Sequence, residues 1–132
     1  MREHGAVYIP DDEYLERVKR AAKILQREGL DALIVNSNES DYANARYFSG
    51  FWPLFERCGV AISPAGDAAL MVGPESREFA ADRSRLDKIF VLKEYREGAD
   101  PAYPELQADT YHDVFKALGI TGKKLRIGVA SY

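Results

Sequence analysis

Few side chains in this sequence have the types and spacing that catalysis requires. The two histidines, His4 and His112, lie far apart, and neither has a second histidine or a cysteine at the spacing of zinc ligands. The one cysteine, Cys58, flanks an apolar segment with no histidine nearby, which favours a buried, inert thiol over a nucleophile. No G-x-S-x-G motif marks a serine nucleophile. The sequence therefore predicts a chain with no catalytic residues and no metal ligands of its own.

The segment GITGKK (119–124) superficially resembles a phosphate-binding loop. Its spacing is too short for that motif, and it follows an expected helix, whereas a phosphate loop leads into a helix N-terminus. Gly119 and Gly122 are therefore expected to be turn residues. The acidic pair Asp11 and Asp12 lies at a helix start, where carboxylates cap the first turn and favour its dipole, so it is not interpreted as a metal site.

A dense aromatic cluster is the most unusual feature of the chain. The stretch NARYFSGFW (44–52) carries four aromatic residues and is followed directly by Pro53. Aromatic residues beside a glycine-ended helix are more often core than binding surface. One short connector cannot bury them all, however. We expect the first aromatics to face the domain's own core, and Trp52 and Phe55 to form an exposed patch at a subunit or domain interface.

The composition is that of one globular domain spanning residues 1–132. Hydrophobic residues make up 46% and charged residues 30%, and the net charge of -3 gives no reason to expect nucleic acid or an anionic membrane as a partner. The sequence shows neither a long apolar run for a membrane span nor the apolar region of a secretory signal. A single cysteine cannot form an internal disulfide, so cytoplasmic residence is expected.

Hydrophobic periodicity predicts helices alternating with strands. Their order is α-β-α-β-β-α-β-α-β, with a turn at PAGD (64–67) joining the two strands of a hairpin. This order predicts a layered α/β domain whose mixed sheet has about five strands. The expected helices cover 11–28, 38–48, 74–82 and 104–119, the expected strands cover 32–35, 59–63, 68–72, 88–92 and 125–131, and a polar loop is expected over 93–103.

The ends of the first two helices carry recognisable signals. Asp11 or Asp12 is expected to cap the first helix, and Gly29 is expected to end it in the left-handed conformation. Asn38 or Ser37 is expected to cap the second. Helical spacing also predicts a buried face on the first helix, formed by Tyr14, Val18, Ala21, Ala22 and Leu25.

The order and spacing of several motifs resemble the opening of the creatinase/prolidase family. EGLDAL (28–33) ends a helix and enters a buried strand, an N-x-x-Y-x-[ST]-G-[aromatic] signature follows at 44–51, and a hairpin follows at 59–74. The likeness extends from about residue 11 to 129. It implies a three-layer α/β/α domain with a ribonuclease-H-like motif but without ribonuclease chemistry. In that family a C-terminal catalytic domain of pita-bread fold follows, and it is absent from these 132 residues.

The resemblance implies a function that depends on the absent domain. The chain resembles the non-catalytic N-terminal domain of a Xaa-Pro dipeptidase or aminopeptidase-like metallohydrolase, inactive by itself, which assists dimerisation and shapes the partner subunit's substrate site. It implies no cofactor in this chain and a divalent metal pair (Mn, Co or Zn) in the catalytic domain. The implied partners are that catalytic domain, a second copy of the full-length protein, and a proline-containing peptide or small carboxylated substrate.

The resemblance also points to three residues that would contact substrate in trans. Phe55-Glu56-Arg57 is similar to an aromatic-x-Arg pair that helps creatinase hold its substrate carboxylate, although the loop here is one residue shorter. A guanidinium offers a carboxylate two parallel hydrogen bonds. The implied substrate-binding residues are Trp52, Phe55 and Arg57. The alternative is that Arg57 pairs with a local acid such as Glu56 or faces solvent.

Three other functions compete with a Xaa-Pro peptidase. A creatinase-type amidinohydrolase has the same pair of domains and needs no metal. A free-standing binding or assembly module would have lost its catalytic half. A nuclease is suggested only by the fold type, and the sequence offers neither an acidic metal cluster nor a basic surface for it.

Overall fold

A mixed five-stranded sheet forms the centre of the molecule. The computed structural model describes residues 8–97 and 107–131. The strand order is β4-β3-β2-β1-β5. β2 runs antiparallel to both of its neighbours, whereas β5 is parallel to β1 and β4 is parallel to β3. The strands are β1 (Ala32–Ser37), β2 (Cys58–Ile62), β3 (Ala68–Val72), β4 (Ile89–Val91) and β5 (Ile127–Ala130).

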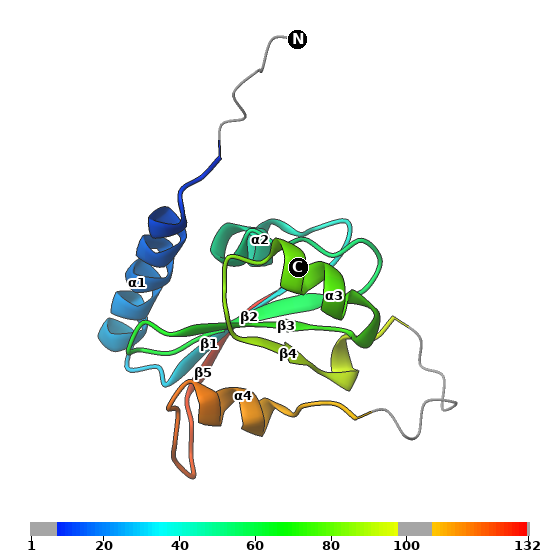
Figure 1. The fold of residues 1–132 in the computed structure, drawn as a ribbon. Helices are drawn as coiled ribbons and strands as arrows, with labels where there is room; N and C mark the ends of the chain where they lie inside the picture. Colours follow the sequence, from blue (N-terminus) through cyan, green and yellow to red (C-terminus); the bar gives the residue numbers. More distant parts are fainter. Residues whose placement is uncertain (1–7, 98–106, 132) are drawn as a thin grey trace.

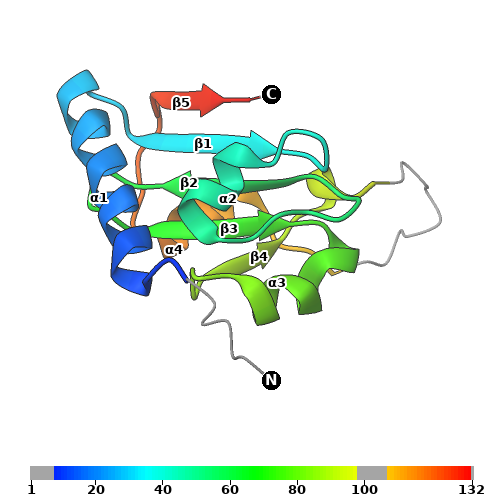
Figure 2. The same ribbon diagram turned by 90° about the horizontal axis from the view of Figure 1, so that it is seen from above.

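Helices cover both faces of the sheet and produce three layers (Figure 1, Figure 2). α1, α2 and α3 lie over one face and α4 over the other, so each face has its own apolar core. The expected α/β/α arrangement with a mixed sheet is therefore confirmed, and the predicted order of elements is found. The helices are α1 (Asp11–Glu28), α2 (Ala43–Ser49), α3 (Arg77–Arg83) and α4 (Tyr111–Ala117), with short 3-10 turns η1 (Pro74–Ser76) and η2 (Lys93–Tyr95). In the described ranges, none of the helices combines the length and apolar character needed to cross a membrane.

The predicted buried face of α1 is confirmed, but its predicted cap is wrong. All five residues expected on that face are buried. Pro10 occupies the N-cap position and no side chain caps the helix, because Asp11 and Asp12 already lie within its first turn. There their charges favour the positive end of the helix dipole. Gly29 ends the helix with a φ of 64°, as predicted.

α2 begins later than predicted because its entry is a separate turn. The side-chain oxygen of Asn38 accepts hydrogen bonds from the backbone N–H groups of Ser40 and Asp41, so the chain turns before the helix starts. The predicted cap is therefore wrong for Asn38. Ser37 does satisfy a free N–H of the first turn, since its hydroxyl accepts a hydrogen bond from Ala45 over 2.9 Å.

The last helix is also shorter than predicted. Residues 104–106 lie outside the described ranges, and residues 107–110 are not helical. The backbone N–H of Asp109 donates to Val91 at the end of β4, and its carboxylate accepts the N–H of Val91 in return. Thr110 and Asp113 then form a capping box that starts α4. Of the polar loop predicted over 93–103, residues 98–103 lie outside the described ranges, and the prediction is wrong at Tyr95, which is 5% exposed.

Candidate functional site

A tight chain reversal after α2 sets the course of the candidate loop. The hydroxyl of Ser49 donates to the carbonyl of Ala45 over 2.6 Å and accepts the N–H of Phe51 over 3.1 Å. Gly50 has a φ of 72°, and a Cβ added there would lie 3.1 Å from Cγ of Arg85. Phe51 is fully buried. The signature at residues 44–51 therefore has a structural role: it turns the chain and anchors it in the core.

The remaining aromatics of this segment are divided between core and surface. Trp52 is half-buried: its ring meets Phe79 edge-on, with centroids 6.0 Å apart, and the guanidinium of Arg46 lies 4.7 Å from its centroid. Phe55 is also half-buried. The prediction that the first aromatics face the core is wrong for Tyr47, which is 45% exposed. Its ring is instead part of the helix surface.

Glu56 has a structural role that excludes one reading of Arg57. The carboxylate is 1% exposed and accepts the backbone N–H of Ser76 over 3.1 Å and that of Glu75 over 3.4 Å. It thereby caps η1, just ahead of α3, and occupies the space that Gly73 leaves by having no Cβ. Burial raises the pKa of Glu56, opposed by its hydrogen bonds. The alternative that Arg57 pairs with Glu56 is therefore wrong.

Arg57 is exposed and lines a small pocket at the carboxyl ends of β1 and β5. These two parallel strands end on the same side of the molecule (Figure 2). In α/β sheets the carboxyl ends of strands are a common place for ligands. The pocket has a volume of about 210 Å³ and is lined by Asn36, Arg57, Glu94, Tyr95, Tyr111 and Ser131.

A hydrogen-bond network forms one wall of this pocket. The hydroxyl of Tyr111 donates to that of Tyr95 over 2.9 Å, and Tyr95 donates to the side-chain oxygen of Asn36 over 2.7 Å. Gly59 lies beneath the network, where an added Cβ would come within 2.6 Å of the Tyr95 oxygen. Burial raises the pKa of Tyr95, so its hydroxyl stays neutral. The wall can therefore orient a polar group, and the lining also carries one basic side chain, Arg57, and one acidic side chain, Glu94.

The structure does not place Trp52 and Arg57 in one hollow. Trp52 lines a larger groove of about 950 Å³ between the start of α1, α2 and the end of α3. Arg57 lines the small pocket at the strand ends. The two thus face different hollows, and Phe55 lies between them in the sequence. Arg57 shares its pocket with the hydrogen-bonded wall of Asn36, Tyr95 and Tyr111, whereas Trp52 shares its groove with arginine and tyrosine side chains.

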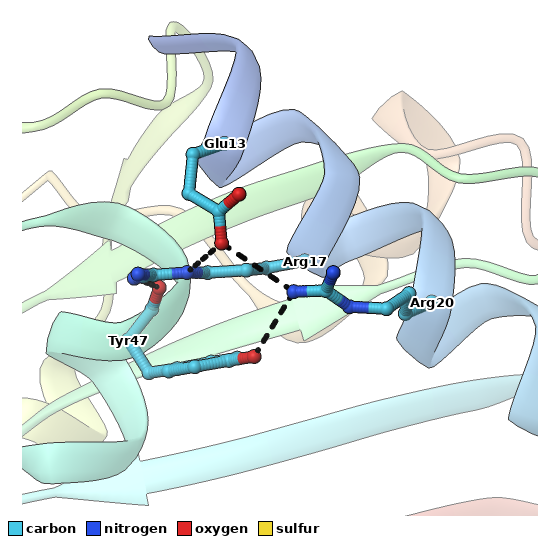
Figure 3. A network of polar contacts seen from close by, with 4 residues as sticks. All are labelled: Glu13, Arg17, Arg20 and Tyr47. Carbon is cyan, nitrogen blue, oxygen red and sulfur yellow. Dashed lines mark hydrogen bonds and ion pairs between the residues drawn. The ribbon is translucent and has the colours of Figure 1, made fainter. Parts of the chain in front are cut away.

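Polar contacts tie α1 to α2 beside the larger groove (Figure 3). The carboxylate of Glu13 accepts from Arg17 over 3.2 Å and from Arg20 over 3.5 Å. Arg17 also donates to the backbone carbonyl of Tyr47 over 2.8 Å, and Arg20 contacts the Tyr47 hydroxyl at 3.4 Å. The guanidinium of Arg17 lies 4.4 Å from the Tyr47 ring centroid. This cation–π contact explains why Tyr47 lies on the surface.

Metal ligands are not assembled in the part of the chain that the structure describes. Among residues 8–97 and 107–131, no three His, Cys, Asp or Glu side chains are close enough to hold a metal ion. His112 is exposed on α4, and His4 lies outside the described residues. The residues described here therefore do not fit a catalytic metal centre.

Cys58 is buried at the start of β2, and burial raises the pKa of its thiol to about 12. The predicted burial of the Cys58 thiol is thus confirmed, and its inertness stays a prediction. We expect no reaction of Cys58 with a disulfide reagent at pH 8, because almost no thiolate is present and access is blocked. Thiol titration with and without concentrated urea tests this expectation. Equal rates in the two solutions would contradict it.

Sequence reasoning missed several residues around the two hollows. The sequence predicts a polar loop at Tyr95 and indicates no capping role for Glu56. It indicates neither the contact of Arg46 with Trp52 nor the surface position of Tyr47. A signal existed for Arg46, since Tyr42 precedes it by four residues on the same helix face and Trp52 follows shortly after.

Comparison with known proteins extends the likeness over most of the chain. The model of the creatinase/prolidase N-terminal domain matches residues 17–132. No curated protein matches the chain. Among solved structures, the N-terminal creatinase/prolidase-like domain of a Corynebacterium diphtheriae protein aligns with a TM-score of 0.56 and 13% identity, covering 90% of this chain and 97% of that one.

Two further structures have the same fold. The prolidase of Pyrococcus furiosus aligns with a TM-score of 0.54 and 19% identity over 87% of this chain and 27% of that chain. The N-terminal domain of the cytoplasmic peptidase PepQ of Mycobacterium tuberculosis H37Rv aligns with a TM-score of 0.52 and 18% identity, covering 89% and 92%. The chain thus spans about a quarter of the archaeal prolidase. By the family match over 17–132, this chain belongs to the creatinase/prolidase N-terminal domain family.

Proposed function

We propose that this chain is the non-catalytic N-terminal domain of a longer Xaa-Pro dipeptidase or aminopeptidase-like metallohydrolase. The observation that carries the proposal is the family match over residues 17–132, combined with the lack of any assembled metal cluster in the described ranges. The similar prolidase of Pyrococcus furiosus is much longer than this chain, which supports a following domain. We also propose a cytoplasmic location, which the M. tuberculosis relative is described as having.

In this proposal the hydrolytic chemistry belongs to the following domain. A divalent metal pair there, of manganese, cobalt or zinc, would supply the activated water for cleavage of a peptide bond before proline. The described residues of this chain do not fit such a centre. Its own contribution is to assist dimerisation and to close the substrate site of the partner subunit.

Arg57 is the residue that best suits a substrate-holding role. It is exposed, so it is available to a ligand or to a second subunit, and the adjoining wall of Asn36 and Tyr95 is ordered by hydrogen bonds. A planar guanidinium can hold a peptide carboxylate through two parallel hydrogen bonds. We propose that Arg57 binds the carboxylate of a short substrate and that Phe55 adds apolar surface. Trp52 remains a proposed substrate contact, but it lines the larger groove and would meet a different part of the substrate.

An activity assay tests the proposal. The purified 132-residue chain is expected to show no turnover of a Gly-Pro dipeptide, whereas the longer protein is expected to hydrolyse it and to lose activity on chelation. Turnover by the 132-residue chain would overturn the proposal. Chelator-resistant hydrolysis of creatine by the longer protein would instead establish the creatinase-type alternative, which a small carboxylate pocket at Arg57 also suits. A coding sequence that stops after Tyr132 would favour a free-standing binding module.

A further inference from the structure

The larger groove is a cluster of arginines and aromatic rings on an acidic protein. We call it the arginine groove. It has a volume of about 950 Å³, and its lining includes four arginines but a single acidic residue, Asp82, whereas the whole chain carries a net charge of -3. The groove is therefore a local concentration of positive charge. Its arginines are Arg17, Arg46, Arg83 and Arg85, and its rings include Tyr42, Tyr47 and Trp52.

Arg46 is the arginine of this groove that is free to bind an anion. Its guanidinium lies 4.7 Å from the ring centroid of Trp52 and 5.7 Å from that of Tyr42, so it is held in place by cation–π contacts. No carboxylate of the described residues forms an ion pair with it. By contrast, Arg17 pairs with Glu13, Arg83 with Asp82, and Arg85 with Asp11.

Exposed apolar side chains border the same groove. Tyr8 is 73% exposed, Ile9 42%, Tyr42 39% and Tyr47 45%. A surface that combines aromatic rings with arginine is typical of protein–protein binding sites, where these residue types contribute most of the affinity. The groove thus offers both charge and apolar area to one extended ligand.

We propose that the arginine groove binds an extended acidic segment of a separate protein chain, with a carboxylate on Arg46 and apolar side chains on the neighbouring rings. Glu13, Asp82 and Asp11 already pair with three of the four arginines, so Arg46 offers one open anion site. One such site suits carboxylates spaced among apolar side chains better than a continuous phosphate backbone.

The chain contains its own reporter for this binding. Trp52 is the only tryptophan and lines the groove, so its fluorescence senses a ligand placed there. The probe is a synthetic nonapeptide of alternating glutamate and phenylalanine, titrated into the 132-residue chain. We expect a saturable change in Trp52 emission that weakens several-fold as salt is raised, because exposed ion pairs are screened. A peptide with lysine in place of glutamate is expected to leave the emission unchanged.

Substitutions identify the anion site. Arg46→Gln is expected to weaken the peptide's Kd about tenfold, which corresponds to the loss of about one charge-assisted hydrogen bond. Arg46→Lys is expected to recover only part of the affinity, since lysine lacks the planar group that stacks on the rings. Arg27→Gln is the matched control: it removes the same charge from the far end of α1, where Arg27 bonds to its neighbour Glu28, and is expected to leave the Kd unchanged.

Three results would overturn the proposal. The first is an equal Kd for Arg46→Gln and the Arg27→Gln control, in proteins whose circular dichroism shows them folded. The second is displacement of the peptide by a thymidine oligonucleotide at a similar concentration, which would assign the groove to nucleic acid. The third is a concentration-dependent dimer that Arg46→Gln abolishes, which would make a second copy of this chain the occupant. None of these readouts depends on peptidase activity, so the inference and the proposed function are tested separately.

Discussion

Replacing Glu56 with alanine is expected to lower the free energy of unfolding by about 3 kcal/mol. The carboxylate is 1% exposed and satisfies the N–H groups of Glu75 and Ser76 at the start of η1. Its removal leaves two donors without a partner, and each unsatisfied buried donor costs roughly 1–3 kcal/mol. Urea unfolding at pH 7, followed by circular dichroism, measures the change.

Two further variants identify the cause of this loss. Glu75→Ala removes an exposed acid from the same turn and is expected to change stability by less than about 0.5 kcal/mol. Glu56→Gln keeps the size of the side chain but only one acceptor, so an intermediate loss is expected. A loss in Glu75→Ala as large as that in Glu56→Ala would contradict the capping role of Glu56.

The stability contributed by Glu56 should also depend on pH. Burial raises its pKa above the ordinary value of 4.5. Between the ordinary and the raised pKa, the folded chain therefore binds the proton more tightly than the unfolded chain does. Its contribution is therefore fully present below the ordinary pKa and decreases as the pH rises through the raised value. The stability difference between the native protein and Glu56→Gln is expected to shrink from pH 4 towards neutrality. A growing difference would mean that the hydrogen bonds outweigh burial.

In the longer protein, Arg57→Ala is expected to raise the KM for a short peptide with a free carboxylate by roughly 10- to 100-fold. A hydrogen bond to a charged group contributes about 1.5–3 kcal/mol, and 1.4 kcal/mol corresponds to a factor of ten. Because Arg57 is exposed, the fold and its melting temperature should not change. Steady-state kinetics on the full-length variant measures the effect.

The substrate itself provides a control for Arg57. With a peptide whose C-terminal carboxylate is amidated, the native protein and Arg57→Ala are expected to have similar KM values, because the group that Arg57 holds is gone. Arg77→Ala, which removes an exposed arginine at the start of α3, is expected to leave both substrates unaffected. Unaltered kinetics in Arg57→Ala would leave this residue as a surface side chain.

Most of the fold could be predicted because its signals are local. The spacing of Val18 and Leu25 identified the buried face of α1, and Gly29 marked its end. The hairpin followed from the turn residues between β2 and β3. The start of α4 also has a local signal, the pair Thr110 and Asp113, which the prediction of a helix from residue 104 does not use.

The hollows could not be predicted to the same extent, because they depend on contacts between distant residues. Tyr95 is buried by its contacts with Asn36 and Tyr111, which come from β1 and α4. Glu56 reaches across twenty residues to cap η1. The groove's other three arginines are each paired with an acid on α1 or α3, and this pairing leaves Arg46 without an ion pair among the described residues. No local pattern carries this information.

Mixed dimers of the longer protein test the central claim most directly, namely that this domain completes the active site of its partner. One subunit carries Arg57→Ala with an intact catalytic domain, and the other carries Arg57 with an inactivated catalytic domain. The only working active site then receives Arg57 from the opposite subunit. We predict that the KM of the mixed dimer returns to the native value. A KM that stays as high as that of the Arg57→Ala homodimer would contradict a role in trans.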